Sequence, residues 1–278
     1  ENKKTDYWNR PYEKSKYQWL PSEFVIDDKG KCKIDSYINN LPEKNIDLKN
    51  SLEKLFDKVL PQFEKIWNYI QMAKLYNKID NDLLYKFGNE KYCDLIKEPK
   101  ISLKNRNLQV ITKIVTYELK DEEMEGAWHV EGMSHENIVA TAVTVIEQTD
   151  NFDAELYFKR RFTVCESSEI SRIAGGSVNY MPNYISNFLG YGGFNDIVKT
   201  EVISGTQITG LIPLGKVQTK KYSLTVFPNS HIHKLDTKNL TKKNGKRTIV
   251  VFWLINPDVQ VLSTKNIEPQ QGKIKLSD

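Results

Sequence analysis

The stretch LQVITKIVTY, residues 108–117, marks the point where the sequence changes from helical to strand-like character. It is rich in β-branched side chains and follows the two-residue period of a strand. Further strand-like segments follow it along the chain, at residues 138–146, 155–162, 206–214, 223–227 and 247–255. Because Gly, Asn, Pro and Asp separate these short segments, we expect a mainly β fold, a sandwich or a barrel.

The preceding region carries a helical pattern in place of the strand pattern. Its apolar residues recur at steps of three and four, as on one face of a helix: Leu52, Leu55, Phe56, Val59, Phe63, Ile66, Trp67 and Ile70. We expect this helix to kink or break at Pro61, since proline removes a backbone donor. A second helical segment is predicted over residues 72–87.

A short hairpin is predicted before the helices, where residues 23–27 and 32–38 flank the polar turn Asp28-Lys29-Gly30. The apolar helical stripe needs a surface to pack on. We therefore expect residues 1–100 to form an N-terminal hairpin and helices that pack on a β core of residues 101–278. The two parts would make one compact unit.

Composition and charge narrow the class of protein. The net charge is +4, but the lysines are scattered along the 278 residues, which argues against a nucleic-acid surface. Cys32, Cys93 and Cys165 are far apart, which argues against a disulfide framework or a zinc knuckle. With no apolar run of membrane-spanning length and no signal-peptide pattern, we expect a protein of the reducing cytoplasm.

The motif GAWHVEGMSHE, residues 126–136, places His129 two residues before Glu131 in a chain with only 4 histidines. On a strand, residues i and i+2 point to the same face, so this imidazole and this carboxylate would project together. They supply two-thirds of the 2-His-1-carboxylate facial triad of non-haem Fe(II) enzymes. The alternative interpretation is a simple hydrogen-bonded His–Glu pair, which is the more common reason for such a spacing.

A third metal ligand would have to be one of the remaining histidines. His135 lies only four residues after Glu131, in a sequence typical of a loop. His231 and His233 follow an apolar strand in FPNSHIHKL, and their spacing places both on one strand face. The spacing alone does not choose between these two residues.

Arg247 is the remaining candidate for a binding role. It opens the nearly continuous apolar run of residues 247–255, so its guanidinium would be buried and would need an anionic partner. Arginine binds a carboxylate through two parallel hydrogen bonds, and a bound 2-oxo acid would supply one. A salt bridge at a strand end is the structural alternative.

The sequence also resembles a family of proteins of unknown function that is best known from fungi and whose hallmark is WHVEGM. Blocks with this likeness occur in order and nearly end to end: YQWLPSEF (17–24), SYINNL (36–41), LQVITKI (108–114), GAWHVEGM (126–133), IVATAV (138–143), LGKVQT (214–219), FPNSHIH (227–233), INPD (255–258) and LSTKNIEPQ (262–270).

The family looks like a distant relative of the Fe(II)/2-oxoglutarate-dependent oxygenases. The resemblance implies a double-stranded β-helix core, also called a jelly-roll or cupin-like core, with an N-terminal helical region. It implies His233 in place of His231 as the distal ligand, because the family's histidine stands at that position of its FPN block. By the same likeness His129, Glu131 and His233 would bind Fe(II), and Arg247 would bind 2-oxoglutarate as co-substrate.

The sequence therefore favours an oxygenase, a hydroxylase by default, acting on a small molecule or a protein side chain that it does not specify. Two alternatives stay open. One is a non-catalytic jelly-roll module for binding or interaction, since a fold does not determine a function. The other is a cupin-type metalloenzyme that does not use 2-oxoglutarate.

Overall fold

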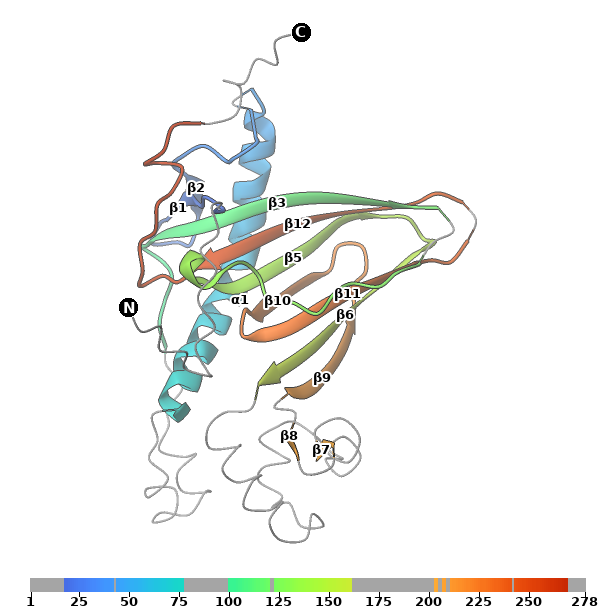
Figure 1. Ribbon diagram of the computed structural model, residues 1–278. Helices are drawn as coiled ribbons and strands as arrows, with labels where there is room; N and C mark the ends of the chain where they lie inside the picture. The colour runs from blue at the N-terminus through green and yellow to red at the C-terminus, as the bar shows by residue number, and fades with distance from the viewer. Residues whose placement is uncertain are drawn as a thin grey trace, which may run out of the picture.

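A computed structural model describes residues 18–42, 44–77, 100–120, 123–161, 203–204, 207–208, 211–241 and 243–269. The described part is mainly β, as the two-residue period predicts, with two antiparallel sheets and one α-helix. Figure 1 shows the helix along one side of the larger sheet and the smaller sheet on the other side.

The larger sheet has six strands in the order β10-β5-β12-β3-β1-β2. All of its neighbouring strands pair antiparallel. The bounds are β1 Ser22–Ile26, β2 Cys32–Ile34, β3 Asn107–Leu119, β5 Ile138–Gln148, β10 Leu224–Pro228 and β12 Gly245–Ile255.

The smaller sheet has four strands in the order β4-β11-β6-β9, again antiparallel. The bounds are β4 Glu123–Met124, β6 Phe152–Arg161, β9 Leu211–Gln218 and β11 His231–Asn239. A short pair consists of β7, Ile203–Ser204, and β8, Gln207–Ile208. From β3 onward the chain crosses repeatedly between the six-stranded and the four-stranded sheet, although β6 and β9 both belong to the latter. Strands distant in sequence therefore become neighbours in each sheet.

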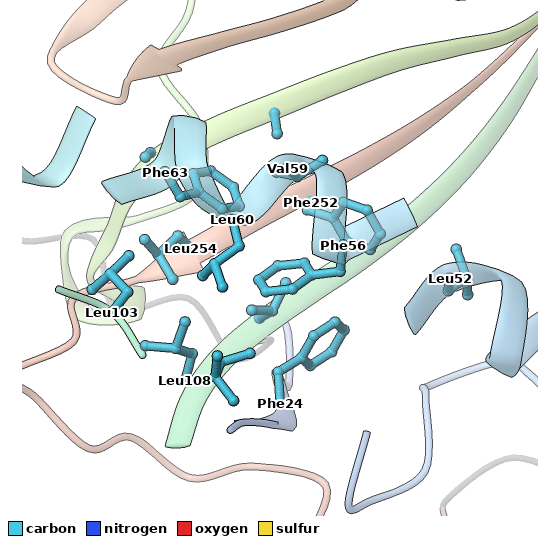
Figure 2. Packing of buried hydrophobic residues seen from close by; sticks show 14 of the residues in the cluster. Phe24, Leu52, Phe56, Val59, Leu60, Phe63, Leu103, Leu108, Phe252 and Leu254 are labelled. Atoms are coloured by element: carbon cyan, nitrogen blue, oxygen red, sulfur yellow. The ribbon is translucent and has the colours of Figure 1, made fainter. Parts of the chain in front are cut away.

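Helix α1, Ile46–Asn77, covers one face of the six-stranded sheet. Its apolar stripe packs there as the sequence predicts. Phe56 lies 4.8 Å from Phe24 of β1 and 5.4 Å from Phe252 of β12, measured between ring centroids. Figure 2 shows these rings interlocking with Leu60, Phe63 and Leu254. Burial of so many large apolar side chains is the main stabilising term for this layer.

Strand β12 is buried on both faces, because a second layer covers the side away from the helix. Val250, Phe252 and Leu254 join the cluster beneath α1. The alternate residues join a second cluster on the opposite face, with Ile111 and Val145: they are Ile249, Val251, Trp253 and Ile255. The four-stranded sheet lies on this second face, where Phe158 of β6 contacts Phe227 of β10 with ring centroids 5.0 Å apart. This explains the continuous apolar run in the sequence.

Several elements differ from their predicted bounds. The hairpin is confirmed as β1 and β2, with Gly30 in the turn at φ 82°. Pro61 lies inside α1 without ending it, and the same helix continues through the first part of the segment predicted as a second helix. Residues 78–87 of that segment lie outside the described residues. The predicted strand 206–214 is divided between β8 and β9.

The polar strand β11 has too few alternating apolar residues to be predicted as a full strand. Cys32 is a free thiol, while Cys93 and Cys165 lie outside the described residues. Within the described ranges, no helix has both the length and the apolar character needed to cross a membrane.

Candidate metal centre

The backbone brings the first and last predicted metal ligands together. The amide N–H of His129 donates to the carbonyl of His233 at 3.0 Å, and the amide N–H of His233 returns the bond at 2.9 Å. His129 thus pairs with β11 through one isolated antiparallel bridge. The strand expected at His129 is therefore a segment that pairs with β11 at this one residue. This single bridge orients the His129 side chain toward Glu131.

The three predicted side chains converge at one point. The Glu131 Oε1 atom lies 3.3 Å from His233 Nε2 and 3.9 Å from His129 Nε2. One ligand atom from each residue lies within 4.8 Å of the other two. Among the described residues this is the one cluster of His, Cys, Asp or Glu with the spacing of a metal site.

Burial is graded across the three ligands. The His233 side chain is 5% exposed, Glu131 18% and His129 49%. One side of the cluster therefore opens to solvent, while the other side rests on the interior. The ring of Phe227 lies 4.7 Å from that of His233 on the inner side. A facial triad needs this asymmetry, because its open positions must admit further ligands.

Both imidazoles are oriented by the backbone two residues earlier. His129 Nδ1 lies 2.7 Å from the carbonyl oxygen of Ala127, and His233 Nδ1 lies 3.3 Å from that of His231. A carbonyl oxygen only accepts hydrogen bonds, so these contacts place a proton on each Nδ1 and leave each Nε2 facing Glu131 as the atom that would bind a metal. Histidine ligands of metals are commonly held in this way, and the donor set fits a divalent cation.

Glu131 is held from behind by Asn229, which stands in the turn between β10 and β11. The Glu131 amide donates to Asn229 Oδ1 at 2.8 Å, and Asn229 Nδ2 donates to the Glu131 carbonyl at 2.8 Å. The same amide group also reaches the carbonyl of Ile138 at 3.0 Å. Asn229 therefore joins the carboxylate segment to the strand that leads to His233.

Glycines in the motif allow the close approach of this segment to its surroundings. A Cβ atom on Gly126 would lie 2.4 Å from the carbonyl oxygen of Leu235 on β11. Gly132 has φ +65°, and a Cβ there would lie 2.6 Å from the carboxylate of Glu136. That buried carboxylate accepts bonds from the amides of Trp19 and Met133. At both glycines of the GAWHVEGM block, a larger residue would therefore clash with its surroundings.

The electrostatic setting of Glu131 favours its ionised form. Burial raises the pKa of this carboxyl, but its hydrogen bond to His233 and the charges of His233 and His129 outweigh that effect, and the net pKa is lowered. An anionic carboxylate between two imidazole nitrogens is the charge state that a divalent cation needs.

Arg247 is fully buried on β12 and does not join the three ligands. Its Nη1 donates to Gln148 Oε1 and, at 2.8 Å, to the Thr219 carbonyl, and its Nη2 donates to Thr219 Oγ1 at 2.7 Å. Burial lowers the pKa of Arg247 to about 10. Tyr117, which pairs with Arg247 across the strands, lies within electrostatic range of both Arg247 and Glu131.

The remaining histidines lie outside the cluster. His135 is exposed in the 3-10 turn Ser134–Glu136. His231 is partly buried, and its carbonyl orients His233 while its own ring lies 6.2 Å from that of Tyr69 on α1. The structure thus places His233, the histidine that the family resemblance implies, beside His129 and Glu131.

Sequence reasoning missed two residues that shape the centre. Asn229 was visible inside the FPNSHIH block, but nothing local gave it a role. Trp253 was hidden within an apolar run that is typical of core. Its ring contacts Trp19 at 5.4 Å, and the Lys113 ammonium lies 5.8 Å from each of these two rings.

Comparisons with known proteins assign the sequence to a family but not to an activity. No curated protein matches the chain. One solved structure, described as "Bacillus endospore appendages form a novel family of disulfide-linked pili", aligns with 6% identity over 56% of this chain and 97% of that one. Its TM-score is 0.22, so the alignment carries no argument. The sequence signature described as "Protein of unknown function (DUF4246)" matches residues 3–100 and 82–277, and the chain belongs to this family.

Proposed function

We propose that this protein is a non-haem Fe(II)-dependent oxygenase that uses 2-oxoglutarate, with hydroxylation as its default reaction. The observation that carries the proposal is the convergence of His129, Glu131 and His233 on one point with one open side. Two imidazoles and one carboxylate with open positions are the donor set typical of Fe(II) oxygenases.

The strand order supports a double-stranded β-helix as the core. Eight strands lie in two facing four-stranded arrays, β10-β5-β12-β3 and β4-β11-β6-β9. The chain alternates between the arrays in the manner of a jelly roll, with β1 and β2 added at one edge. In this arrangement the ligand histidine on β11 and Arg247 on β12 come from consecutive strands.

The residues have separate roles in this account. His129, Glu131 and His233 would hold the metal, and Fe(II) would supply the redox chemistry with O2 that protein side chains lack. 2-Oxoglutarate loses CO2 and gains one oxygen atom to become succinate. The second oxygen atom enters a C–H bond of the substrate as a hydroxyl group, so that the atoms balance.

The hydrogen bonding of Arg247 supports the co-substrate role. Its three hydrogen bonds use the two Nη atoms, whereas its buried Nε–H makes no hydrogen bond to any described residue. The Nε–H and the second hydrogen of Nη2 form one edge of the guanidinium. That edge suits the far carboxylate of a 2-oxo diacid, which would satisfy the buried donor.

A metalloenzyme of the cupin type without 2-oxoglutarate is the second candidate. The observation that favours it is that Gln148 and Thr219 already bind Arg247, so the arginine also has a structural role in joining β5, β12 and the segment after β9. A binding module without catalysis would keep the same fold and need no open metal position.

Absorption spectroscopy under anaerobic conditions separates these candidates. Fe(II) and 2-oxoglutarate together should give a metal-to-ligand charge-transfer band with the wild-type protein and none with Glu131→Ala. His231→Ala is the matched control and should keep the band, because its ring does not face the cluster. A wild-type protein that binds Fe(II) but gives no band would exclude the 2-oxoglutarate reaction and favour the second candidate.

A further inference from the structure

Two buried polar groups beside the metal centre are incompletely hydrogen-bonded. The indole Nε1 of Trp253 and the hydroxyl of Thr141 make no hydrogen bond of normal geometry to any residue that the structure describes. Trp253 is 6% exposed and Thr141 0%. A buried donor without an acceptor is costly, and natural proteins keep few of them. Where such groups border a candidate site, they indicate a place where a ligand atom can bind.

The two groups are neighbours on the inner face of the six-stranded sheet. Thr141 of β5 stands directly opposite Trp253 of β12 in the strand register. On its other side Thr141 stands opposite Phe227 of β10. These three residues therefore form one row across the sheet.

The row borders the three ligands at both ends. The Phe227 ring lies 4.7 Å from that of His233. The indole of Trp253 lies beside the carboxylate of Glu131. Thr141 lies between these two contacts, on the sheet face that carries Phe227 and Trp253.

We propose that Thr141 and Trp253 form a subsite that binds an oxygen atom of a small organic acid while that acid chelates the metal. The inference rests on the metal centre proposed above, and it assigns the near carboxylate of the 2-oxo acid to this pair. An indole N–H only donates, and a threonine hydroxyl also donates, so the pair selects a group rich in lone pairs. Arg247 would then bind the far carboxylate.

The chemical neighbourhood favours an anion in this subsite. Beyond Trp253, the ammonium group of Lys113 lies over the rings of both Trp253 and Trp19. No carboxylate within the described ranges pairs with Lys113. A carboxylate bound here would meet two hydrogen-bond donors and the metal, with the Lys113 cation over the Trp253 ring.

Oxalate tests the subsite separately from Arg247, because it chelates a metal through two oxygens and has no far carboxylate. The full chain is loaded with Co(II), and oxalate is titrated while the visible absorption of Co(II) is followed. Thr141→Val removes the hydroxyl and keeps the shape, whereas Trp253→Phe removes the indole N–H together with part of the ring. Each should weaken oxalate binding by about tenfold, the effect of one lost hydrogen bond, with Co(II) affinity unchanged.

Thr144→Val is the matched control. Thr144 lies on the same strand and is also buried with an unpartnered hydroxyl, but it faces the helix side, opposite Val250 and Leu224. This variant should bind oxalate like the wild type. Thr141→Ser keeps the hydroxyl and should restore most of the affinity, which shows that loss in Thr141→Val comes from the lost polar group.

Each remaining outcome has a defined meaning. Equal oxalate affinity in Trp253→Phe, Thr141→Val and the wild type would overturn the subsite. Weaker Co(II) binding with unchanged oxalate binding in Trp253→Phe would also overturn it, since Trp253 would then only orient Glu131. If both variants lose oxalate affinity but the wild type shows no 2-oxoglutarate band, the subsite stands and the oxygenase falls. A wild type that binds no Co(II) overturns both.

Discussion

His129 and His233, 104 positions apart in the chain, exchange both backbone hydrogen bonds of an antiparallel bridge, at 3.0 and 2.9 Å. The bridge fixes the separation of two imidazole rings whose centroids lie 4.4 Å apart. It also fixes which histidine of the His231–His233 pair faces Glu131, because alternate residues of β11 share a face and only His233 is in register with His129.

Removal of the distal histidine tests this register. His233→Ala should abolish measurable binding of Co(II), since two ligands rarely retain a divalent metal, whereas His231→Ala should keep most of it. Isothermal titration of the metal-free protein measures both affinities. Loss of binding in His231→Ala with retention in His233→Ala would show that the register is wrong by two residues.

Gly132 gives a second prediction, on the shape of the motif. Gly132→Ala should lower the free energy of unfolding by about 2–5 kcal/mol, because the left-handed backbone strains alanine and its Cβ meets Glu136. Gly215→Ala is the matched control, with φ +92° but nothing within 4 Å of its Cβ. It should lose only about 1–2 kcal/mol. Equal losses in urea unfolding would remove the steric argument.

The third prediction concerns Arg247 and the co-substrate. Arg247→Lys keeps a charge but loses the planar fork, so 2-oxoglutarate should bind about tenfold more weakly. Metal affinity should stay nearly unchanged, because the ligands come from elsewhere in the fold. Titration of the charge-transfer band and of Fe(II) measures the two effects. An equal 2-oxoglutarate response in both proteins would assign the far carboxylate to another residue.

The fourth prediction concerns the helix layer. Phe56→Ala should destabilise the protein by about 3–5 kcal/mol, because its buried ring contacts Phe24 and Phe252. Leu48→Ala, on the exposed side of the same helix, should change stability by less than about 0.5 kcal/mol. A fragment of residues 101–278 should melt well below the full chain. An unchanged melting temperature for that fragment would contradict the single unit.

Local sequence was sufficient for much of the fold. The stripe from Leu52 to Ile70 predicts α1, and the strand-like segments predict β3, β5, β6, β10 and β12 close to their bounds. Pro61 shows where local rules end, because contacts of its neighbours with the sheet keep the helix intact. The polar strand β11 is stabilised by pairing with β6 along its full length, which no local pattern reveals.

The candidate site was likewise predictable from local sequence only in part. His129 and Glu131 were readable from their spacing, while the choice of His233 came from the family resemblance, because both histidines of HIH fit one strand face. The roles of Asn229, Thr141 and Trp253 depend on contacts between segments about 90 to 110 residues apart. Such contacts are set by strand register, which a single sequence does not specify.

The most direct test of the central claim is a crystal structure of the protein saturated with Mn(II) as a stand-in for Fe(II), with the metal located by anomalous scattering. The account predicts one metal, bound by His129 Nε2, His233 Nε2 and a Glu131 oxygen at about 2.0–2.3 Å. A metal bound at other residues, or no metal at saturation with these three side chains pointing apart, would contradict it.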